Sequence, residues 1–213
     1  FNTDLEGDGA FICQNSWGDN FGENGFFYIS YYDTNIGTHN VVYTDIENTD
    51  NYDHIYQSDL CGWVGQLGYN KDSIYGANVF TAEGNETLKA ASFYATGKDS
   101  QYELYVVRQF EDETSLEKMI PVASGKLGNA GYYTVDFNQG IEVDAGERYA
   151  VVLYIITPGS VHPMAIEYAA DEATENVDLD DGESYISANG SKWVSVDTVE
   201  KSNLCIKAFS DNR

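Results

Sequence analysis

The clearest chemical pattern in the chain lies within residues 14–33, which read QNSWGDNFGENGFFYISYYD. An asparagine amide and an indole stand two positions apart, at Asn15 and Trp17, and glycines follow them at short intervals. An amide side chain both donates and accepts hydrogen bonds, so it can fix the orientation of a neighbouring side chain. The glycines predict a tight turn that leads into a strand over residues 25–32.

The same stretch resembles the asparagine region of papain-like cysteine peptidases. The resemblance is carried by NSWG, which begins at Asn15, and by FGENGFFYIS over residues 21–30. It departs from the family pattern at Phe21, where Trp is usual, and at Phe26, where Tyr is common. The resemblance implies that the Asn15 side-chain oxygen orients a catalytic imidazole. It also implies that Trp17 covers that hydrogen bond and keeps water away from it.

The resemblance extends to only one member of the catalytic triad. The family's nucleophilic Cys lies far upstream of the Asn, and its His also precedes the Asn. Here Cys13 stands two residues before Asn15 on the same expected strand, and His39, His54 and His162 all follow. We interpret the three histidines as exposed or structural, and we expect the chain alone to be inactive. It resembles the C-terminal part of a secreted peptidase, cut just upstream of the Asn.

The charge balance excludes several classes of partner. Lys and Arg number 11 against 35 Asp and Glu, which gives a net charge of −24. Nucleic-acid binding depends on basic residues that displace counterions, so this surface would repel a phosphate backbone. Anionic membrane surfaces are disfavoured for the same reason. The acidity suits a neutral polymer such as a polysaccharide, and calcium, but solubility alone explains it equally well.

The three cysteines, Cys13, Cys61 and Cys205, do not form a disulfide framework or a paired metal-ligand spacing. One bridge, between Cys61 and Cys205, is the alternative to three buried free thiols, which we favour and which fit an anaerobic habitat. The longest apolar run, YAVVLYII over 149–156, falls short of the roughly 20 residues that a spanning helix needs. We therefore expect no membrane insertion, and the chain shows no signal peptide.

Short runs rich in Val, Ile, Tyr and Phe, separated by Gly, Asn and Asp, predict an all-β sandwich or jelly roll. The run over 147–157 is apolar on both faces and predicts a central strand. The segment 112–119 predicts one helical turn or a loop, and Asn189-Gly190 predicts a hairpin turn before Trp193. The expected strands are 10–14, 25–32, 39–46, 52–57, 75–81, 87–95, 101–109, 130–137, 147–157, 162–168, 183–188, 192–196 and 203–210.

Three parts follow from this pattern. We expect the end of a papain-like peptidase domain over 1–36, a connecting strand and loop over 37–60, and a β-sandwich over 61–213. The last part resembles the lectin-like domain that follows such peptidases in surface proteins of anaerobic bacteria. The stretches that carry this resemblance are ANVFTAEGNETLKAASFYA, YELYVV, GYYTVDF, GERYAVVLYI and NLCIKAF. They are core strands, so they indicate a fold rather than a binding site.

Aromatic side chains can stack on the apolar faces of sugar rings, and large aromatics also fill β-sandwich cores. Trp63 and Tyr69 lie in the Gly-rich stretch CGWVGQLGYNKDS, where rings are hard to bury, so we favour them as carbohydrate-binding residues. Trp193 is a third candidate, for which packing over the hairpin is the favoured alternative. Other aromatic candidates are Tyr75, Tyr132, Tyr133 and Tyr185.

Two loops concentrate acidic residues, ENTDNYD over 47–53 and NVDLDDGES over 176–184. Calcium takes several oxygen ligands, but the second loop has Asp181 where a calcium-binding EF-hand loop needs Gly. We expect solvated acidic loops rather than a metal site, with calcium as the alternative and no other cofactor.

The sequence thus predicts a non-catalytic, lectin-like module of a secreted papain-like peptidase, at the surface of an anaerobic Gram-positive bacterium. Its expected partners are the peptidase domain of the same precursor and a polysaccharide or glycoprotein. The first alternative is a structural domain that packs on the peptidase without a ligand. The second is a glycosidase that uses paired carboxylates, although nothing in the sequence singles out such a pair.

Overall fold

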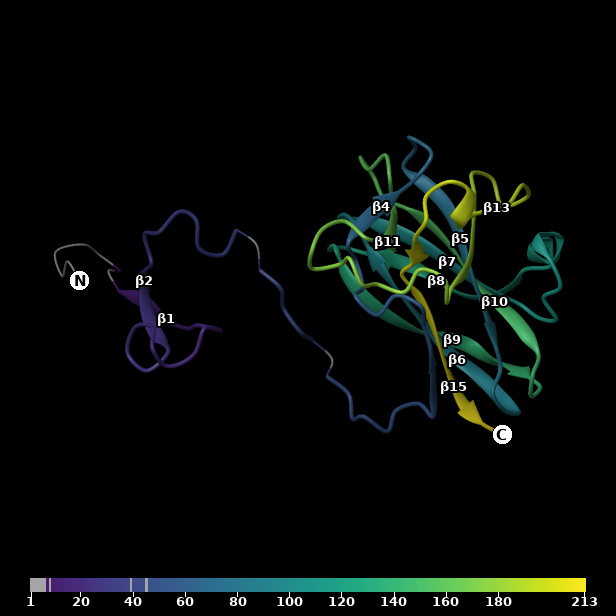
Figure 1. Ribbon diagram of the computed structural model, residues 1–213, viewed down its shortest axis with the longest axis horizontal. Helices are drawn as coiled ribbons and strands as arrows, with labels where there is room; N and C mark the ends of the chain where they lie inside the picture. Colours follow the sequence, from purple (N-terminus) through teal and green to yellow (C-terminus); the bar gives the residue numbers. More distant parts are fainter. Residues whose placement is uncertain (1–6, 8, 39, 45) are drawn as a thin grey trace. The chain divides into compact units, whose positions relative to one another are not determined.

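The computed structural model describes residues 7, 9–38, 40–44 and 46–213, and the chain divides into two compact units (Figure 1). The first unit is Phe1–Asn48 and the second is Thr49–Arg213. His39, which the sequence interpretation assigns as an ordinary histidine, lies outside the described residues. Within the described residues, no helix is long and apolar enough to cross a membrane.

The first unit contains one antiparallel hairpin. Strand β1 (Ala10–Gln14) pairs with β2 (Phe26–Ser30), with Cys13 opposite Phe27. These strands confirm the predictions over 10–14 and 25–32. The strand predicted over 39–46 is wrong for the described residues 40–44 and 46, which form no strand. The β-branched and aromatic residues of VVYT favour a strand, but here they are exposed and pair with no other strand.

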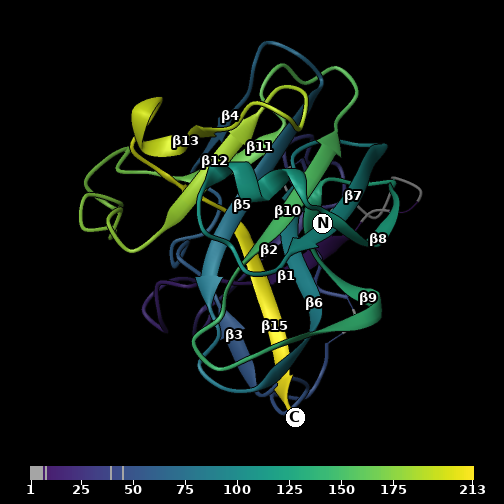
Figure 2. The same cartoon turned by 90° about the vertical axis from the view of Figure 1, so that its right-hand side faces the viewer.

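The second unit is a β-sandwich, as predicted (Figures 1 and 2). A six-stranded sheet has the order β13-β12-β5-β10-β7-β8, a four-stranded sheet the order β3-β15-β6-β9, and a three-stranded sheet the order β14-β11-β4. All pairings are antiparallel. The strands are β3 (His54–Tyr56), β4 (Gly65–Leu67), β5 (Ser73–Thr81), β6 (Glu86–Ala95), β7 (Ser100–Val107), β8 (Ile120–Leu127), β9 (Gly131–Val143), β10 (Arg148–Ile156), β11 (Met164–Glu167), β12 (Glu183–Ser187), β13 (Val194–Ser195), β14 (Asn203–Leu204) and β15 (Ile206–Asn212).

Strand β10 occupies the middle of the six-stranded sheet, between β5 and β7, as its apolar sequence predicts. Successive side chains of a strand point to opposite faces of the sheet. One face of β10 packs toward the four-stranded sheet in the main core, and the other forms a second buried cluster. The first set is Tyr149, Val151, Leu153 and Ile155, and the second includes Ala150 and Val152.

The second cluster is covered by the connection between β7 and β8. A short 3-10 helix, η1 (Glu113–Glu117), lies within the predicted turn over 112–119 and begins at Asp112, whose side chain accepts a hydrogen bond from the Thr114 backbone. Leu116 of this helix and Phe110 before it are buried against the sheet. The sheet therefore excludes water on both faces at its centre.

The predictions fail mainly at the sheet edges. Strands β4 and β8 are not predicted, and β8 carries Pro121 and Gly125, which disfavour strand assignments. The strand predicted over 192–196 is only two residues long. The Asn189-Gly190 turn connects β12 to β13 through a longer loop than two residues, with Gly190 at a φ of 74°. Strand β3 matches the strand predicted over 52–57, within the connecting strand and loop expected over 37–60, and it pairs with β15.

A buried carboxylate joins three strands of the four-stranded sheet. Glu86 of β6 is fully buried and accepts hydrogen bonds from Tyr56 Oη at 2.7 Å and Ser210 Oγ at 2.5 Å. The backbone N–H of Gly84 donates to it at 2.7 Å. Burial alone would raise the pKa of Glu86, but the hydrogen bonds from Ser210, Tyr56 and Gly84 outweigh it and lower the pKa.

We expect Glu86→Gln to lower the free energy of unfolding by about 1–3 kcal/mol, because the new amide N–H groups would face donors that lose their acceptor. Urea unfolding measures this, with the exposed Glu172→Gln as a matched control that should change little. Because the folded pKa is lowered, the stabilisation is present above the ordinary value of 4.5 and is lost as the pH falls through the folded pKa. An unchanged stability in Glu86→Gln at pH 7 would contradict this assignment.

Candidate functional site

The hairpin of the first unit holds the Asn15 side chain by both ends of its amide. Asn15 Nδ2 donates to the Gly25 carbonyl at 2.9 Å, and the Trp17 backbone N–H donates to Asn15 Oδ1 at 2.6 Å. A carbonyl oxygen has two acceptor lone pairs, so Oδ1 retains one for a further donor. The amide is thus oriented to accept an N–H from an imidazole, but this role stays a prediction.

The turn that orients Asn15 depends on glycine. Gly22 has a φ of +66°, and a Cβ there would lie 2.1 Å from the Phe26 carbonyl oxygen. Trp17 is 77% exposed and meets the ring of Phe21 edge-on at 5.2 Å between centroids. The indole therefore lies at the surface of this unit, and its predicted covering of a hydrogen bond stays a prediction.

None of the cysteines or described histidines has the surroundings of a catalytic pair within its unit. All three thiols are free, but only Cys205 is buried, so the expectation that all are buried is wrong: Cys61 is exposed and Cys13 is partly buried. His54 lies on β3, where its Nε2 is 2.9 Å from Asn212 Oδ1, and this contact raises its pKa. His162 lies in the loop before β11, and its backbone N–H donates to Ser160 Oγ.

The structure brings the predicted residue Trp63 together with two tyrosines on the outer face of the four-stranded sheet. Trp63 lies 5.8 Å from Tyr94 of β6, and Tyr94 lies 4.9 Å from Tyr132 of β9, between ring centroids. Tyr94 and Tyr132 are opposite each other in the β6–β9 register. Trp63 is 37% exposed and Tyr132 44% exposed. We name these three residues the aromatic platform.

Gly62 permits the close approach of the Trp63 loop to β6. It has a φ of +71°, and a Cβ there would lie 2.9 Å from the Tyr94 hydroxyl. The Tyr132 hydroxyl lies 2.5 Å from Ser92 Oγ, which fixes the ring against the sheet. Burial raises the pKa of both tyrosines, so their hydroxyls stay protonated at neutral pH. The platform therefore combines exposed ring surface with hydroxyl groups that can donate or accept hydrogen bonds.

The other two predicted carbohydrate-binding residues lie elsewhere. Tyr69 is partly buried against the main core, and burial raises its pKa. Trp193 packs edge-on against Tyr75 at 6.2 Å and belongs to the second cluster. Its Nε1 is buried without a hydrogen-bond partner among the described residues. Neither ring joins the platform, and the position of Trp193 matches the packing alternative.

The acidic loop over 176–184 packs onto the sandwich around the buried Asn203. Asn203 Nδ2 lies 2.8 Å from the carbonyls of Ser58 and Asp178, and 3.0 Å from Glu167 Oε2. Burial, followed by the nearby charge of Asp178, raises the pKa of Asp181. Across the described residues, no group of three or more His, Cys, Asp and Glu side chains could hold a metal ion. Calcium at this loop stays an alternative.

The sequence alone does not predict that Tyr94 and Tyr132 lie side by side in the platform. Tyr94 and Tyr132 lie on strands far apart in the chain, and only their register places them side by side. The available signal is alternation: the neighbouring Phe93 is fully buried, which turns Tyr94 to the opposite, outer face. Tyr132 was among the wider set of aromatic candidates, whereas Tyr94 was not.

The fold and its sequence agree with a known domain family. A sequence model of the family described as "Lectin like domain" matches residues 55–210. The chain belongs to the lectin-like domain family. The match runs from within β3 to within β15, includes the platform, and excludes the hairpin that holds Asn15.

Two solved structures share the fold of this lectin-like chain. One is the clostridial cysteine protease Cwp84 after propeptide cleavage, with 24% identity and a TM-score of 0.77 over all of this chain and 54% of that one. The other contains the cysteine protease and lectin-like domains of Cwp84, a surface-layer associated protein of Clostridium difficile. It has 24% identity and a TM-score of 0.73 over 96% of this chain and 46% of that one. This chain therefore spans about half the length of each. No curated protein matches the chain.

We expect Asn203→Ala to lower the free energy of unfolding by about 1–3 kcal/mol, because it removes the buried donor to Glu167 Oε2 and to the carbonyls of Ser58 and Asp178. Urea unfolding measures the change, and the exposed Asn176→Ala in the same acidic loop serves as the matched control. Equal stabilities of the two variants would show that the Asn203 amide does not hold the loop in place.

Proposed function

We propose that this chain is the lectin-like module of a secreted or surface-bound papain-like cysteine peptidase, and that it binds a glycan. The observation that carries the glycan proposal is the aromatic platform of Trp63, Tyr94 and Tyr132. Core aromatics of a sandwich are buried, whereas these rings form a contiguous cluster of which two members are well exposed. Rings of this kind offer apolar surface to a sugar, while their polar ends and neighbours contact its hydroxyls.

The surroundings of the platform favour a neutral glycan. Lys207, on the same outer face, pairs with the buried Asp59 at 2.9 Å, so its charge is already compensated. The net charge of −24 opposes anionic polymers at a distance. A neutral polysaccharide needs no free lysine to pair with, and the net negative charge does not repel it. Bound to it, the module would raise the effective concentration of an attached peptidase near its substrate.

The hairpin supports the second half of the proposal, that the module belongs with a peptidase domain. Its large apolar side chains are exposed, including those of Phe11, Ile12 and Tyr28. A two-stranded hairpin alone is marginally stable in water, so this surface requires a partner. We infer that the partner is the remainder of a papain-like domain, which supplies the Cys and His that Asn15 would serve.

The two Cwp84 structures lend further support, because Cwp84 has both a cysteine protease and a lectin-like domain and is associated with a surface layer. By this analogy we place the chain at the surface of an anaerobic Gram-positive bacterium. The competing function is a domain that only packs on and supports the peptidase. The exposed apolar surface of the hairpin favours such packing, and the platform favours a ligand in addition.

We expect the chain to bind at least one polymer on an array of glycans and cell-wall polysaccharides. Trp63→Ala and Tyr132→Ala should each weaken binding about tenfold or more, because each removes stacking surface. The matched control is Tyr28→Ala, which removes a tyrosine of similar exposure from the hairpin.

An array without a hit, or a hit that both platform variants retain, would contradict the platform and favour the packing function. The array is run with calcium and again with a chelator. Binding that the chelator abolishes would point to a metal at the acidic loop over 176–184 and would overturn the expectation of a metal-free module.

We also expect the purified chain to hydrolyse no peptide, even with a thiol reductant. Cys13 stands two residues before Asn15 in the hairpin rather than across a cleft from it, and it lies on the strand that leads to the Asn. A fluorogenic peptide library measures this, with a Cys61→Ser variant as a control for the exposed thiol. Thiol-dependent hydrolysis that survives repurification and is lost in a cysteine variant would refute it.

A further inference from the structure

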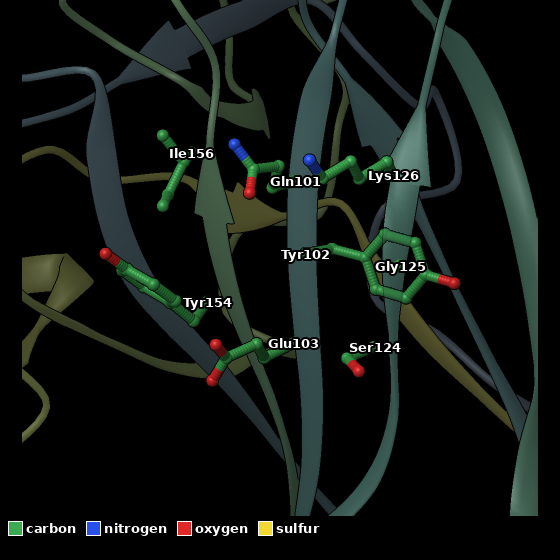
Figure 3. Close-up of a pocket in the computed structure, with 8 residues that line it drawn as sticks. All are labelled: Gln101, Tyr102, Glu103, Ser124, Gly125, Lys126, Tyr154 and Ile156. Carbon is green, nitrogen blue, oxygen red and sulfur yellow. The ribbon is translucent and has the colours of Figure 1, made fainter.

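A pocket of about 260 Å³ lies on the outer face of the six-stranded sheet, and Figure 3 shows the side chains that line it. Three neighbouring strands line it, β10, β7 and β8. The register arranges its outward side chains in two rows. One row is Tyr154, Glu103 and Ser124, and the other is Ile156, Gln101 and Lys126.

The alternation along β7 decides which face carries the pocket. Tyr102 and Leu104 pack into the main core between the sheets, so Gln101 and Glu103 point outward. The platform is on the outer face of the other sheet, since the adjacent Phe93 packs into that same core. The two sites therefore lie on opposite sides of the sandwich, and neither contributes a residue to the other.

Two of the pocket's side chains are held in position by neighbours. The ring of Tyr154 stacks on Tyr75 with centroids 4.2 Å apart and planes 22° from parallel. The carboxylate of Glu103 accepts a hydrogen bond from the Tyr105 hydroxyl. Burial, together with Glu103, raises the pKa of Tyr105, so this hydroxyl remains a donor at neutral pH. An aromatic ring and a carboxylate are thus presented to the pocket in fixed orientations.

The remaining polar groups are available to a ligand. In the part of the chain that the structure describes, the side chains of Gln101, Ser124 and Lys126 have no hydrogen bond or ion pair with another residue. Together with Glu103 they offer ammonium donors, a carboxylate acceptor, and an amide and a hydroxyl that can do both. A sugar residue presents hydroxyls that both donate and accept hydrogen bonds around an apolar ring face, so it matches this set of groups.

The volume of the pocket and the charges of its side chains limit which ligands it can bind. Pockets for drug-sized ligands measure about 300–1,000 Å³, so this one suits a single sugar residue. Glu103 and Lys126 carry opposite charges, so the pocket selects neither an anion nor a cation. We propose that it is a second saccharide site that takes one neutral sugar residue, stacked on Tyr154 and hydrogen-bonded by Gln101, Glu103, Ser124 and Lys126.

This inference rests on the proposal that the domain binds glycans, and it adds a site with its own specificity. With sites on opposite sides of the sandwich, one module holds two glycan chains at once. Engagement of both sites on a dense polysaccharide would raise the apparent affinity well above that of either site.

The test uses the whole chain carrying Trp63→Ala and Tyr132→Ala, which remove both well-exposed rings of the platform and leave the pocket intact. Saturation-transfer NMR is recorded with glucose, galactose, mannose and N-acetylglucosamine in turn. We expect at least one sugar to bind, and Tyr154→Ala and Lys126→Ala, each added to this background, to weaken it about tenfold. Lys118→Ala is the matched control for charge, because this lysine is exposed outside the pocket. Glu103→Gln, which preserves shape, should weaken binding without lowering the melting temperature.

Ionic strength separates a neutral sugar from a charged ligand. Raising NaCl from about 50 to about 500 mM should change sugar binding less than twofold, since screening acts on charged ligands. Glycylglycine, a zwitterion that could bridge Glu103 and Lys126, is the competing probe. If glycylglycine binds, with an affinity that falls steeply as NaCl rises, and none of the sugars binds, the saccharide proposal is overturned.

The remaining outcomes separate the two proposals. No sugar signal in the chain carrying Trp63→Ala and Tyr132→Ala, with polysaccharide binding intact in the unsubstituted chain, overturns the pocket and leaves the platform standing. A signal that persists in the folded Tyr154→Ala and Lys126→Ala variants also overturns it. If the unsubstituted chain binds no glycan at all, the proposed function itself is contradicted.

Discussion

The architecture of the second unit depends on one constraint, that strand β10 is buried on both faces. Its inner side chains need the four-stranded sheet against them, and its outer side chains need the η1 segment with Phe110 and Leu116. Both coverings bury apolar area, which is the main favourable term in folding. Because β10 is paired along both edges, its orientation also fixes which residues of β5 and β7 face outward. The position of the pocket on β10, β7 and β8 follows from that choice.

The η1 segment covers only part of the outer face of the six-stranded sheet, so the rest of that face is open to solvent. The η1 segment buries the part of the sheet near Val107 and Ala150, but the rows through Glu103 and Gln101 remain open to solvent. Tyrosine suits such a boundary, because one end of its ring can be buried while its hydroxyl stays hydrated. Tyr154 stacked on Tyr75 illustrates this. The four-stranded sheet has a similar boundary at the platform, with Tyr132 anchored to Ser92.

The sequence predicts this fold best where burial is complete. The apolar run over 147–157 identifies β10 and its central place, since only a strand covered on both faces tolerates such a run. Prediction fails at edges: β8 contains Pro121 yet pairs with β7, and the strand-like residues at 40–44 have nothing to pair with. At the candidate site, the Gly-rich loop predicts that Trp63 is hard to bury, and the ring is partly exposed. Its association with Tyr94 and Tyr132 could not be predicted, because cross-strand register is a property of the tertiary structure.

In the hairpin, by contrast, the clearest sequence pattern occurs where little apolar surface is buried. NSWG is the most recognisable pattern in the chain, yet its strands leave Phe11, Ile12 and Trp17 exposed. The pattern is recognisable because its local geometry needs specific groups, an amide held at both ends and a glycine whose added Cβ would strike a carbonyl. Those demands fix the local turn and contribute little burial. On the proposal that the hairpin belongs to a papain-like domain, the rest of that domain would cover these side chains, and the precision with which Asn15 is held would depend on that contact.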